Sequence, residues 1–170
     1  MRGMKSHSFL RQLILVCLCL AMAAIVVGQY RGRRNVTRVP LTIMKETGFL
    51  TFKAHLNGKE ILMAVDTAAN TTTFDMGLVE ELQLSSAQNS GISLRLGNND
   101  MPIQAAHVKD FRVGNLSYHG DFSFVDLSRP NRGIEASGDP PIQGLLGADI
   151  LVKWNAAIDY KDSCLIIRNR

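Results

Sequence analysis

Short apolar segments separated by turn-forming residues make up most of this chain beyond residue 40. They are rich in β-branched and aromatic residues, and turn signals such as Asn57-Gly58 stand between them. Strands this short and this regularly interrupted are typical of a mainly β domain, in which closure or packing of the sheet buries one face of each strand. The segments read LTIM, GFLTFKAHL, KEILMAVDT, GISLRL, PIQAAHV, FRVG, DFSFVDL, AAIDY and CLIIR.

Two stretches have helical rather than alternating periodicity. Residues 76–84 and 148–154 each carry apolar residues three or four positions apart, so we expect a short helix in each. Residues 128–142 are rich in Pro, Gly and Ser and predict an exposed loop.

The N-terminal part has a different character. Residues 13–27 form an uncharged apolar run with basic residues on both sides, which indicates a transmembrane anchor. A cleaved signal peptide is the alternative, because Ala21 and Ala23, or Val26 and Gly28, resemble a signal-peptidase site.

We therefore expect an N-terminal signal anchor or transmembrane segment over residues 1–30, a basic tether over 31–40 and one folded domain over 41–170. The protein is expected to be a single-pass membrane protein with the domain on the extracytoplasmic side, or a secreted or periplasmic protein after signal cleavage. Basic residues flank both ends of the apolar run, so the positive-inside rule does not fix its orientation.

The formal net charge of +4 does not indicate a nucleic-acid partner. Basic residues gather beside the apolar run, where they suit lipid headgroups, whereas beyond Pro40 both signs of charge are interspersed. Three of the four histidines, His55, His107 and His119, fall on separate predicted strands without the paired spacing of metal ligands, so no metal site is predicted. Cys164 is the one cysteine outside the apolar run, which leaves no disulfide within the domain.

A carboxylate follows directly on a predicted buried strand. The strand EILMAV is the second arm of the hairpin that turns at Asn57-Gly58, and it runs into Asp66-Thr67-Ala68-Ala69-Asn70. About eighty residues further on, residues 142–151 read IQGLLGADIL, which is an apolar-apolar-Gly element leading into a predicted helix.

Together these two motifs resemble those of the retropepsin-like aspartic proteases, whose single lobe has an apolar strand ending in Asp-Thr/Ser-Gly-Ala and a later apolar-apolar-Gly element. The resemblance covers residues 41–170 and points to a membrane-anchored, bacterial-type member. It implies a closed antiparallel β barrel with one or two short helices. The site residues that it implies are catalytic Asp66, the active-site loop Thr67, Ala68 and Ala69, the supporting element Leu145, Leu146 and Gly147, and a flap with Gly97, Asn98, Asn99 and Asp100 at its tip.

The reaction that the resemblance implies is hydrolysis of extended peptides by water, without metal or cofactor. Two carboxylates that share one proton are needed, and this chain has one such motif, so a homodimer is expected in which each protomer supplies Asp66. The third motif position holds Ala68 instead of glycine, and the added methyl can crowd the carboxylates or the substrate. The alternative function is therefore a catalytically impaired, membrane-tethered module that binds peptides without cleaving them.

Other interpretations of the same residues remain open. Taken locally, Asp66 is more typical of a turn or cap residue at the end of a strand, and it is the second motif that favours the protease interpretation. Asp149 at a helix start and Asp159 at a strand end have ordinary structural uses, so no catalytic role is assigned to either. A β-rich envelope or adhesion protein unrelated to proteases is a third class of function.

Overall fold

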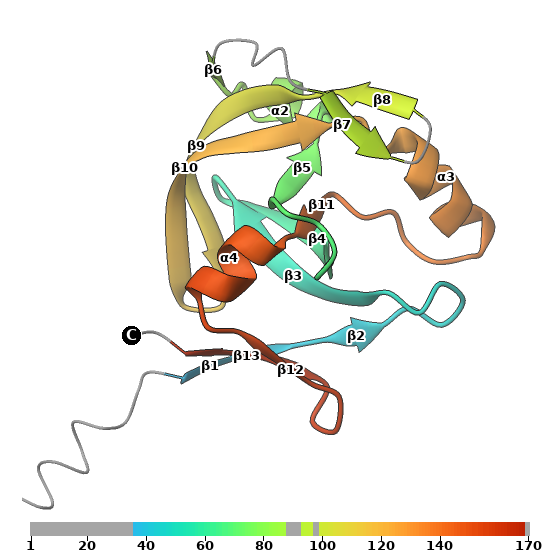
Figure 1. The fold of residues 1–170 in the computed structure, drawn as a ribbon, viewed down its shortest axis with the longest axis vertical. Helices are drawn as coiled ribbons and strands as arrows, with labels where there is room; N and C mark the ends of the chain where they lie inside the picture. The colour runs from blue at the N-terminus through green and yellow to red at the C-terminus, as the bar shows by residue number, and fades with distance from the viewer. Residues whose placement is uncertain (1–35, 88–92, 97–98, 169–170) are drawn as a thin grey trace, which may run out of the picture. The chain divides into compact units, whose positions relative to one another are not determined.

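The computed structural model describes residues 36–87, 93–96 and 99–168, and Val36–Arg170 forms one compact unit (Figure 1). The predicted anchor and most of the predicted tether lie outside the described residues. The strands are β1 Val36–Pro40, β2 Thr42–Ile43, β3 Leu50–Leu56, β4 Lys59–Val65, β5 Thr73–Asp75, β6 Ser86–Ala87, β7 Ser93–Leu96, β8 Asn99–Pro102, β9 Gln104–Val113, β10 Leu116–Val125, β11 Gly144–Leu146, β12 Ala157–Asp159 and β13 Cys164–Arg168, and the helices are α2 Gly77–Glu81, α3 Ser128–Ala136 and α4 Ala148–Lys153.

Six strands close into a barrel in the order β3-β4-β11-β5-β10-β9, with β9 pairing back onto β3. This confirms the predicted mainly β fold with a closed barrel. The barrel is not wholly antiparallel as expected, because β11 runs parallel to β4 and β5 runs parallel to β10. The reason is topological: the chain leaves β4 through a loop instead of a hairpin, and β11 fills the gap between β4 and β5.

The hairpin between β3 and β4 turns where the sequence predicts it. Asn57 and Gly58 have φ angles of 47° and 90°, the left-handed conformations that such a two-residue turn requires. The Asn57 side chain also accepts hydrogen bonds from the backbone amides of Lys109 and Asp110, each at 3.0 Å, which ties the turn to β9. Asn57 is therefore fixed both by its turn conformation and by its tertiary contact with β9.

Aromatic rings fill the inside of the barrel. Phe74 of β5 is fully buried, and its ring centroid lies 5.1 Å from that of Phe111, 5.2 Å from that of Phe122 and 5.5 Å from that of Phe124. Trp154, which directly follows α4, stacks on Phe111 at 6.4 Å, so α4 packs against the barrel core. This packing places the start of α4, and hence the second predicted motif, beside the ends of the barrel strands.

The two ends of the unit form a separate three-stranded sheet in the order β1-β13-β12. Residues 36–40, predicted as the end of a basic tether, are strand β1 and pair antiparallel with β13, so they belong to the same compact unit as the barrel. Buried and exposed residues alternate there as in a strand, with Thr37 and Val39 buried. The neighbouring arginines make the segment look like a basic tether in the sequence. The predicted strand segments AAIDY and CLIIR contain β12 and β13, which pair antiparallel, and Cys164 is buried on β13.

Helices α2 and α4 confirm the two predicted helices, whereas α3 occupies part of the predicted loop over residues 128–142. Helix α3 carries a single buried apolar residue, Ile134, which packs against Met44, Ala64 and Ile142. Asn131 fixes the helix further, because its side chain accepts a hydrogen bond from the Ile142 amide and donates one to the Ile142 carbonyl. Met44 and Ala64 are distant in sequence, and the Pro, Gly and Ser residues of this stretch favoured a loop.

None of the helices within the described part of the chain is long and apolar enough to cross a membrane. The predicted anchor over residues 13–27 lies outside that part.

Candidate active site

Asp66 directly follows β4 and opens the loop of residues 66–72 that leads to β5, here called the Asp66 loop. Its carboxyl oxygen Oδ1 accepts hydrogen bonds from the Ala68 amide at 3.0 Å and the Ala69 amide at 3.2 Å. These bonds orient the carboxyl group and form the Asx turn that Asp commonly makes at a strand end. For the other oxygen, Oδ2, no hydrogen-bond partner is found among the described residues. The side chain is half-buried, while Thr67 and Ala68 beside it are exposed.

The second predicted motif lies next to this loop. Strand β11 places Leu146 beside Val65 in parallel register, and the Leu146 carbonyl accepts a hydrogen bond from the Asp66 amide at 3.0 Å. Leu146 is fully buried, and Leu145 packs on the small apolar cluster beneath α3. The structure thus brings together Asp66 and the Leu145-Leu146-Gly147 element, which are about eighty residues apart in sequence.

Further hydrogen bonds join the Asp66 loop to the start of α4. The Ala148 amide donates to the Ala69 carbonyl at 2.8 Å, and the Asp149 amide donates to the Asn70 carbonyl at 3.2 Å. Together with the hydrogen bond from the Asp66 amide to Leu146, these contacts hold residues 66, 69 and 70 of the loop. The position of the Asp66 carboxyl group is therefore set by a buried strand on one side and a helix start on the other.

Gly147 is required by this close approach of two backbones. A Cβ atom at residue 147 would lie 2.5 Å from the Thr71 carbonyl carbon and 2.8 Å from the Thr72 nitrogen. The backbone of Gly147 is extended, with φ −90° and ψ 176°, so the demand for glycine is one of space and not of conformation.

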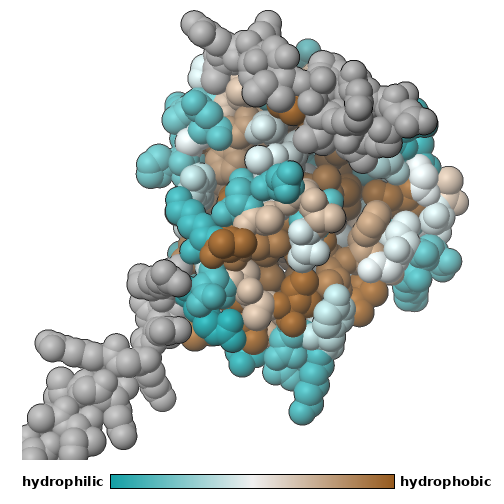
Figure 2. All heavy atoms as spheres, viewed as in Figure 1, coloured by the Kyte–Doolittle hydropathy of each residue, from teal (hydrophilic) through white to brown (hydrophobic). Residues whose placement is uncertain are grey.

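Thr67 borders a shallow depression of about 350 Å³ on the outer surface of α4. The other residues lining it are Ala148, Leu151, Val152, Asn155 and Ala156. Val152 is 78% exposed, which is unusual for a large apolar side chain. Figure 2 shows apolar side chains reaching the surface over the middle of the face on which α4 lies. An apolar surface thus adjoins the Asp66 loop.

The predicted flap coincides with a two-stranded antiparallel hairpin of β7 and β8, in which Arg95 faces Asp100 and Leu96 faces Asn99. Gly97 and Asn98, which stand between the two strands in the sequence, lie outside the described residues. The hairpin has no strand pairing with the barrel within the described part of the chain.

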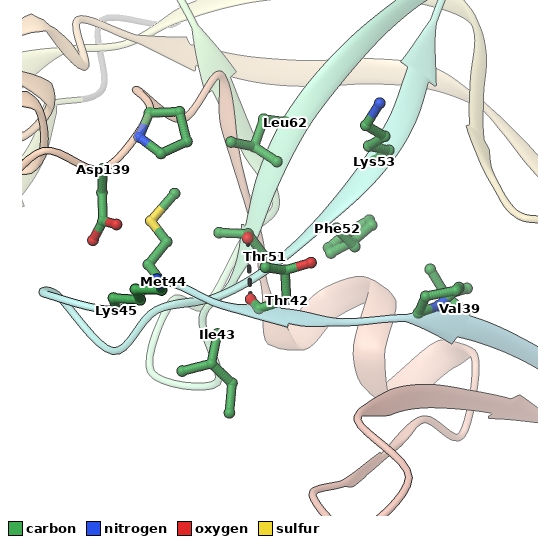
Figure 3. Close-up of a pocket in the computed structure, with 12 residues that line it drawn as sticks. Val39, Thr42, Ile43, Met44, Lys45, Thr51, Phe52, Lys53, Leu62 and Asp139 are labelled. Carbon is green, nitrogen blue, oxygen red and sulfur yellow. Dashed lines mark hydrogen bonds between the residues drawn. The ribbon is translucent and has the colours of Figure 1, made fainter.

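A second concavity, of about 490 Å³, lies on the outer side of β3 and β4 and is bounded by β2 and the turn after α3 (Figure 3). In Figure 3, Leu62 and Lys53 stand on one side and Met44 and Asp139 on another, and a hydrogen bond from the Thr51 hydroxyl to the Thr42 carbonyl crosses its floor. None of the predicted site residues lines it. It is therefore separate from the carboxylate site.

The histidines do not come together. His107 lies 2.9 Å from Asp121 across β9 and β10, and both side chains are exposed. Within residues 36–87, 93–96 and 99–168, no group of three or more potential metal-binding side chains is found.

Sequence inspection missed the role of Thr72 in this site. Thr72 is buried and hydrogen-bonds with residues 147 and 149, but in sequence it is one of three consecutive threonines. Asp149 was noticed only as a residue at a helix start. Its hydrogen bonds with Thr72 are visible only in the three-dimensional structure.

Solved structures with this architecture define the class of fold. The retroviral protease-like domain of Ddi1 from Leishmania major superposes with a TM-score of 0.51 at 16% identity, over 72% of this chain and 90% of that one. A retropepsin-like aspartic protease from Rickettsia conorii gives 0.51 at 19% identity, over 79% and 92% of the two chains. The EIAV protease in complex with the inhibitor HBY-793 gives 0.50 at 14% identity, over 69% and 99%. At these identities the likeness establishes the fold.

The sequence model of the aspartyl protease family matches residues 52–150, which is more than half of the chain. This chain therefore belongs to the aspartyl protease family, as a retropepsin-like, single-lobe member. No curated protein sequence matches it significantly.

Proposed function

We propose that this chain is an aspartic endopeptidase that acts as a homodimer, with Asp66 of each protomer supplying one carboxylate of a shared pair. The setting of the Asp66 carboxyl group supports this most directly. Backbone amides hold Oδ1, whereas Oδ2 has no partner in the described part of the chain and the side chain is only half-buried. A carboxylate that is oriented yet accessible suits acid–base chemistry.

The chemistry follows from placing two such groups a few ångströms apart. Like charges at that distance cannot both ionise, so the pair holds one proton. The ionised carboxylate then takes a proton from a water molecule as that water attacks the peptide carbonyl. The protonated carboxyl group donates its proton to the carbonyl oxygen. One chain contributes one Asp66, so a monomer lacks this pair.

The surface beside Thr67 supports dimer formation. In a two-fold interface each residue near the axis faces its own copy, and exposed Thr67 and Val152 lie next to the Asp66 loop at which the two sites would meet. We propose that the Thr67 hydroxyl hydrogen-bonds to the partner backbone and that Val152 is covered by the second protomer. The β7–β8 hairpin would then close over an extended peptide and exclude water.

The dimer proposal predicts a large effect of Val152→Arg. Burying two extra cations at a two-fold interface is unfavourable, so we expect the dissociation constant of the dimer to rise at least about 100-fold, or about 2.7 kcal/mol. Sedimentation velocity of the full-length chain in detergent measures this constant. Ile43→Arg is the matched control, since Ile43 is 52% exposed and does not line the depression near Thr67. An unchanged dimer in Val152→Arg would place the interface elsewhere.

We also propose that the protease is tethered to a membrane through residues 13–27, because this run is uncharged and flanked by basic residues. An extracytoplasmic position of the domain remains part of this proposal.

The second candidate function is a peptide-binding module without catalysis. Ala68 favours it, because its exposed methyl group stands beside the carboxyl group at the position where the family has glycine. The Ala68 amide still donates to Asp66, so the donor that orients the carboxyl group is retained.

Incubation of the full-length chain with an unbiased peptide library at acidic and neutral pH separates the two functions. We expect cleavage of extended peptides, blocked by a statine-type inhibitor whose hydroxyl group takes the place of the attacking water. Peptide binding without any cleavage would support the binding module instead. Cleavage that the inhibitor leaves untouched would contradict an aspartic mechanism.

A further inference from the structure

The far end of the Asp66 loop is held to α4 by side chains as well as by backbone. Asp149 Oδ1 accepts two hydrogen bonds from Thr72, one from its amide and one from its hydroxyl, each at 2.8 Å. The Thr72 hydroxyl oxygen in turn accepts a hydrogen bond from the Gly147 amide at 3.0 Å. Thr72 and Asp149 thus form a compact clamp, with Gly147 as its third member.

This clamp lies one residue from the backbone bond that positions Asp66. The Leu146 carbonyl accepts from the Asp66 amide, and Gly147 is the next residue in the chain. Because Thr72 is 2% exposed, loss of its partner would leave polar groups buried without hydrogen bonds. The clamp therefore fixes the C-terminal end of the Asp66 loop, whereas Asp66 lies at its N-terminal end.

An ordinary role for Asp149 as a helix cap does not account for these contacts. Asp149 lies in the first turn of α4, where a negative charge is favourable, but no side chain caps this helix. Its Oδ1 atom is instead bonded to Thr72, across the site from the helix. Gly147, whose amide donates to the Thr72 hydroxyl, is also the glycine at which an added Cβ would lie closest to the loop backbone.

We infer that Asp149 is a positioning residue: through Thr72 it holds the Asp66 loop at the spacing and orientation that the Asp66 carboxyl group needs for catalysis. This inference rests on the proposed function. Thr67 and Ala68 are exposed, so the position of the loop depends on the contacts of its other residues with residues 146–149. Catalytic groups tolerate displacements of only about 0.5 Å. A loosened clamp would therefore reduce turnover more than it reduces substrate binding.

The kinetic test compares Asp149→Ala with Asp149→Asn in the full-length chain. Alanine removes the acceptor, and we expect kcat to fall by about 10- to 100-fold with KM changed by less than about threefold. Asparagine keeps an Oδ1 acceptor for both Thr72 bonds, and we expect kcat within about threefold of the parent. Unchanged kcat in Asp149→Ala, or an equal loss in both variants, would overturn the positioning role.

A second pair of variants tests the same clamp from the other side. Thr72→Val removes the hydroxyl at almost constant volume, whereas Thr72→Ser keeps it, so only the first is expected to lower kcat. The double variant Asp149→Ala/Thr72→Val is expected to lose little more than either single variant, because both remove the hydrogen bond between the Thr72 hydroxyl and Asp149. Fully multiplicative losses would show that the two residues act independently and would overturn the clamp.

Hydrogen exchange distinguishes a failure of this inference from a failure of the proposed function. In Asp149→Ala we expect faster exchange in peptides covering residues 66–72 and 146–149, measured by mass spectrometry whether or not the protein cleaves peptides. Asp126→Ala is the matched control, since exposed Asp126 also accepts an amide hydrogen bond near a helix start, from Ser128. Equal exchange of the Asp66 loop in the parent and Asp149→Ala would overturn the inference even if the parent is active.

Discussion

Replacing Asp66 with asparagine is expected to lower peptide cleavage by at least about 1000-fold, because the paired site then has no carboxylate to accept the proton of the attacking water. Asparagine is nearly isosteric, and its Oδ1 atom can still accept the Ala68 and Ala69 amides that hold Asp66. We therefore expect the fold and the dimer to survive. The rate of cleavage of a peptide substrate, together with sedimentation of the same sample, measures both properties.

Asp121→Asn provides the control for a general loss of charge. Asp121 lies on β10, is exposed and pairs with His107, so its replacement is expected to leave cleavage within about twofold. Cleavage by Asp66→Asn at the parental rate would show that Asp66 is only the turn residue that its Asx geometry also permits. That result would contradict the aspartic mechanism and would leave the β-barrel fold unaffected.

Gly147→Ala is expected to destabilise the fold by about 3 kcal/mol, since the added Cβ meets backbone atoms of Thr71 and Thr72 at 2.5 to 2.8 Å. Backbone atoms cannot move aside as the end of a side chain can, so either the loop or α4 must shift. Thermal unfolding followed by circular dichroism measures the loss. We expect cleavage to fall as well, because the same shift displaces the Asp66 loop.

Two other glycines give a graded comparison. At Gly133 in α3, a Cβ meets nothing within 4 Å, so Gly133→Ala is expected to stabilise the protein by about 0.5 to 1 kcal/mol. At Gly144 a Cβ would meet the flexible end of Met63 at 2.9 Å and the Phe74 ring and Thr73 carbonyl oxygen at 3.0 Å, so a loss smaller than that at Gly147, where backbone atoms lie at 2.5 Å, is expected. If Gly147→Ala were as stable as the parent, the close approach of α4 and the Asp66 loop would be contradicted.

The predictions that succeeded rest on local patterns. Alternating apolar residues and the Asn57-Gly58 turn indicated the β3–β4 hairpin, and helical spacing indicated α2 and α4. The structure also brings together the carboxylate that follows a buried strand and the Leu-Leu-Gly element, while their role in catalysis stays a prediction. Each of these signals is carried by residues close to one another in the chain.

The predictions that failed concern contacts between distant residues. Helix α3 is stabilised by burial of Ile134 against Met44 and Ala64, which lie far from the helix in the sequence. Strand β1 contains Arg38 and follows three further arginines, so its residues have the composition of a tether, and its pairing with β13 is a contact between the two ends of the unit. The clamp between Thr72 and Asp149 joins residues 77 positions apart.

The sequence by itself determined where most strands and turns lie, that the domain is mainly β, and that a lone carboxylate follows a buried strand. Only the tertiary structure decided which strands are parallel, that α3 exists, and which side chains hold the Asp66 loop. The physical reason is that periodicity and turn propensity act over a few residues, whereas barrel closure determines which distant backbones approach closely enough to form hydrogen bonds.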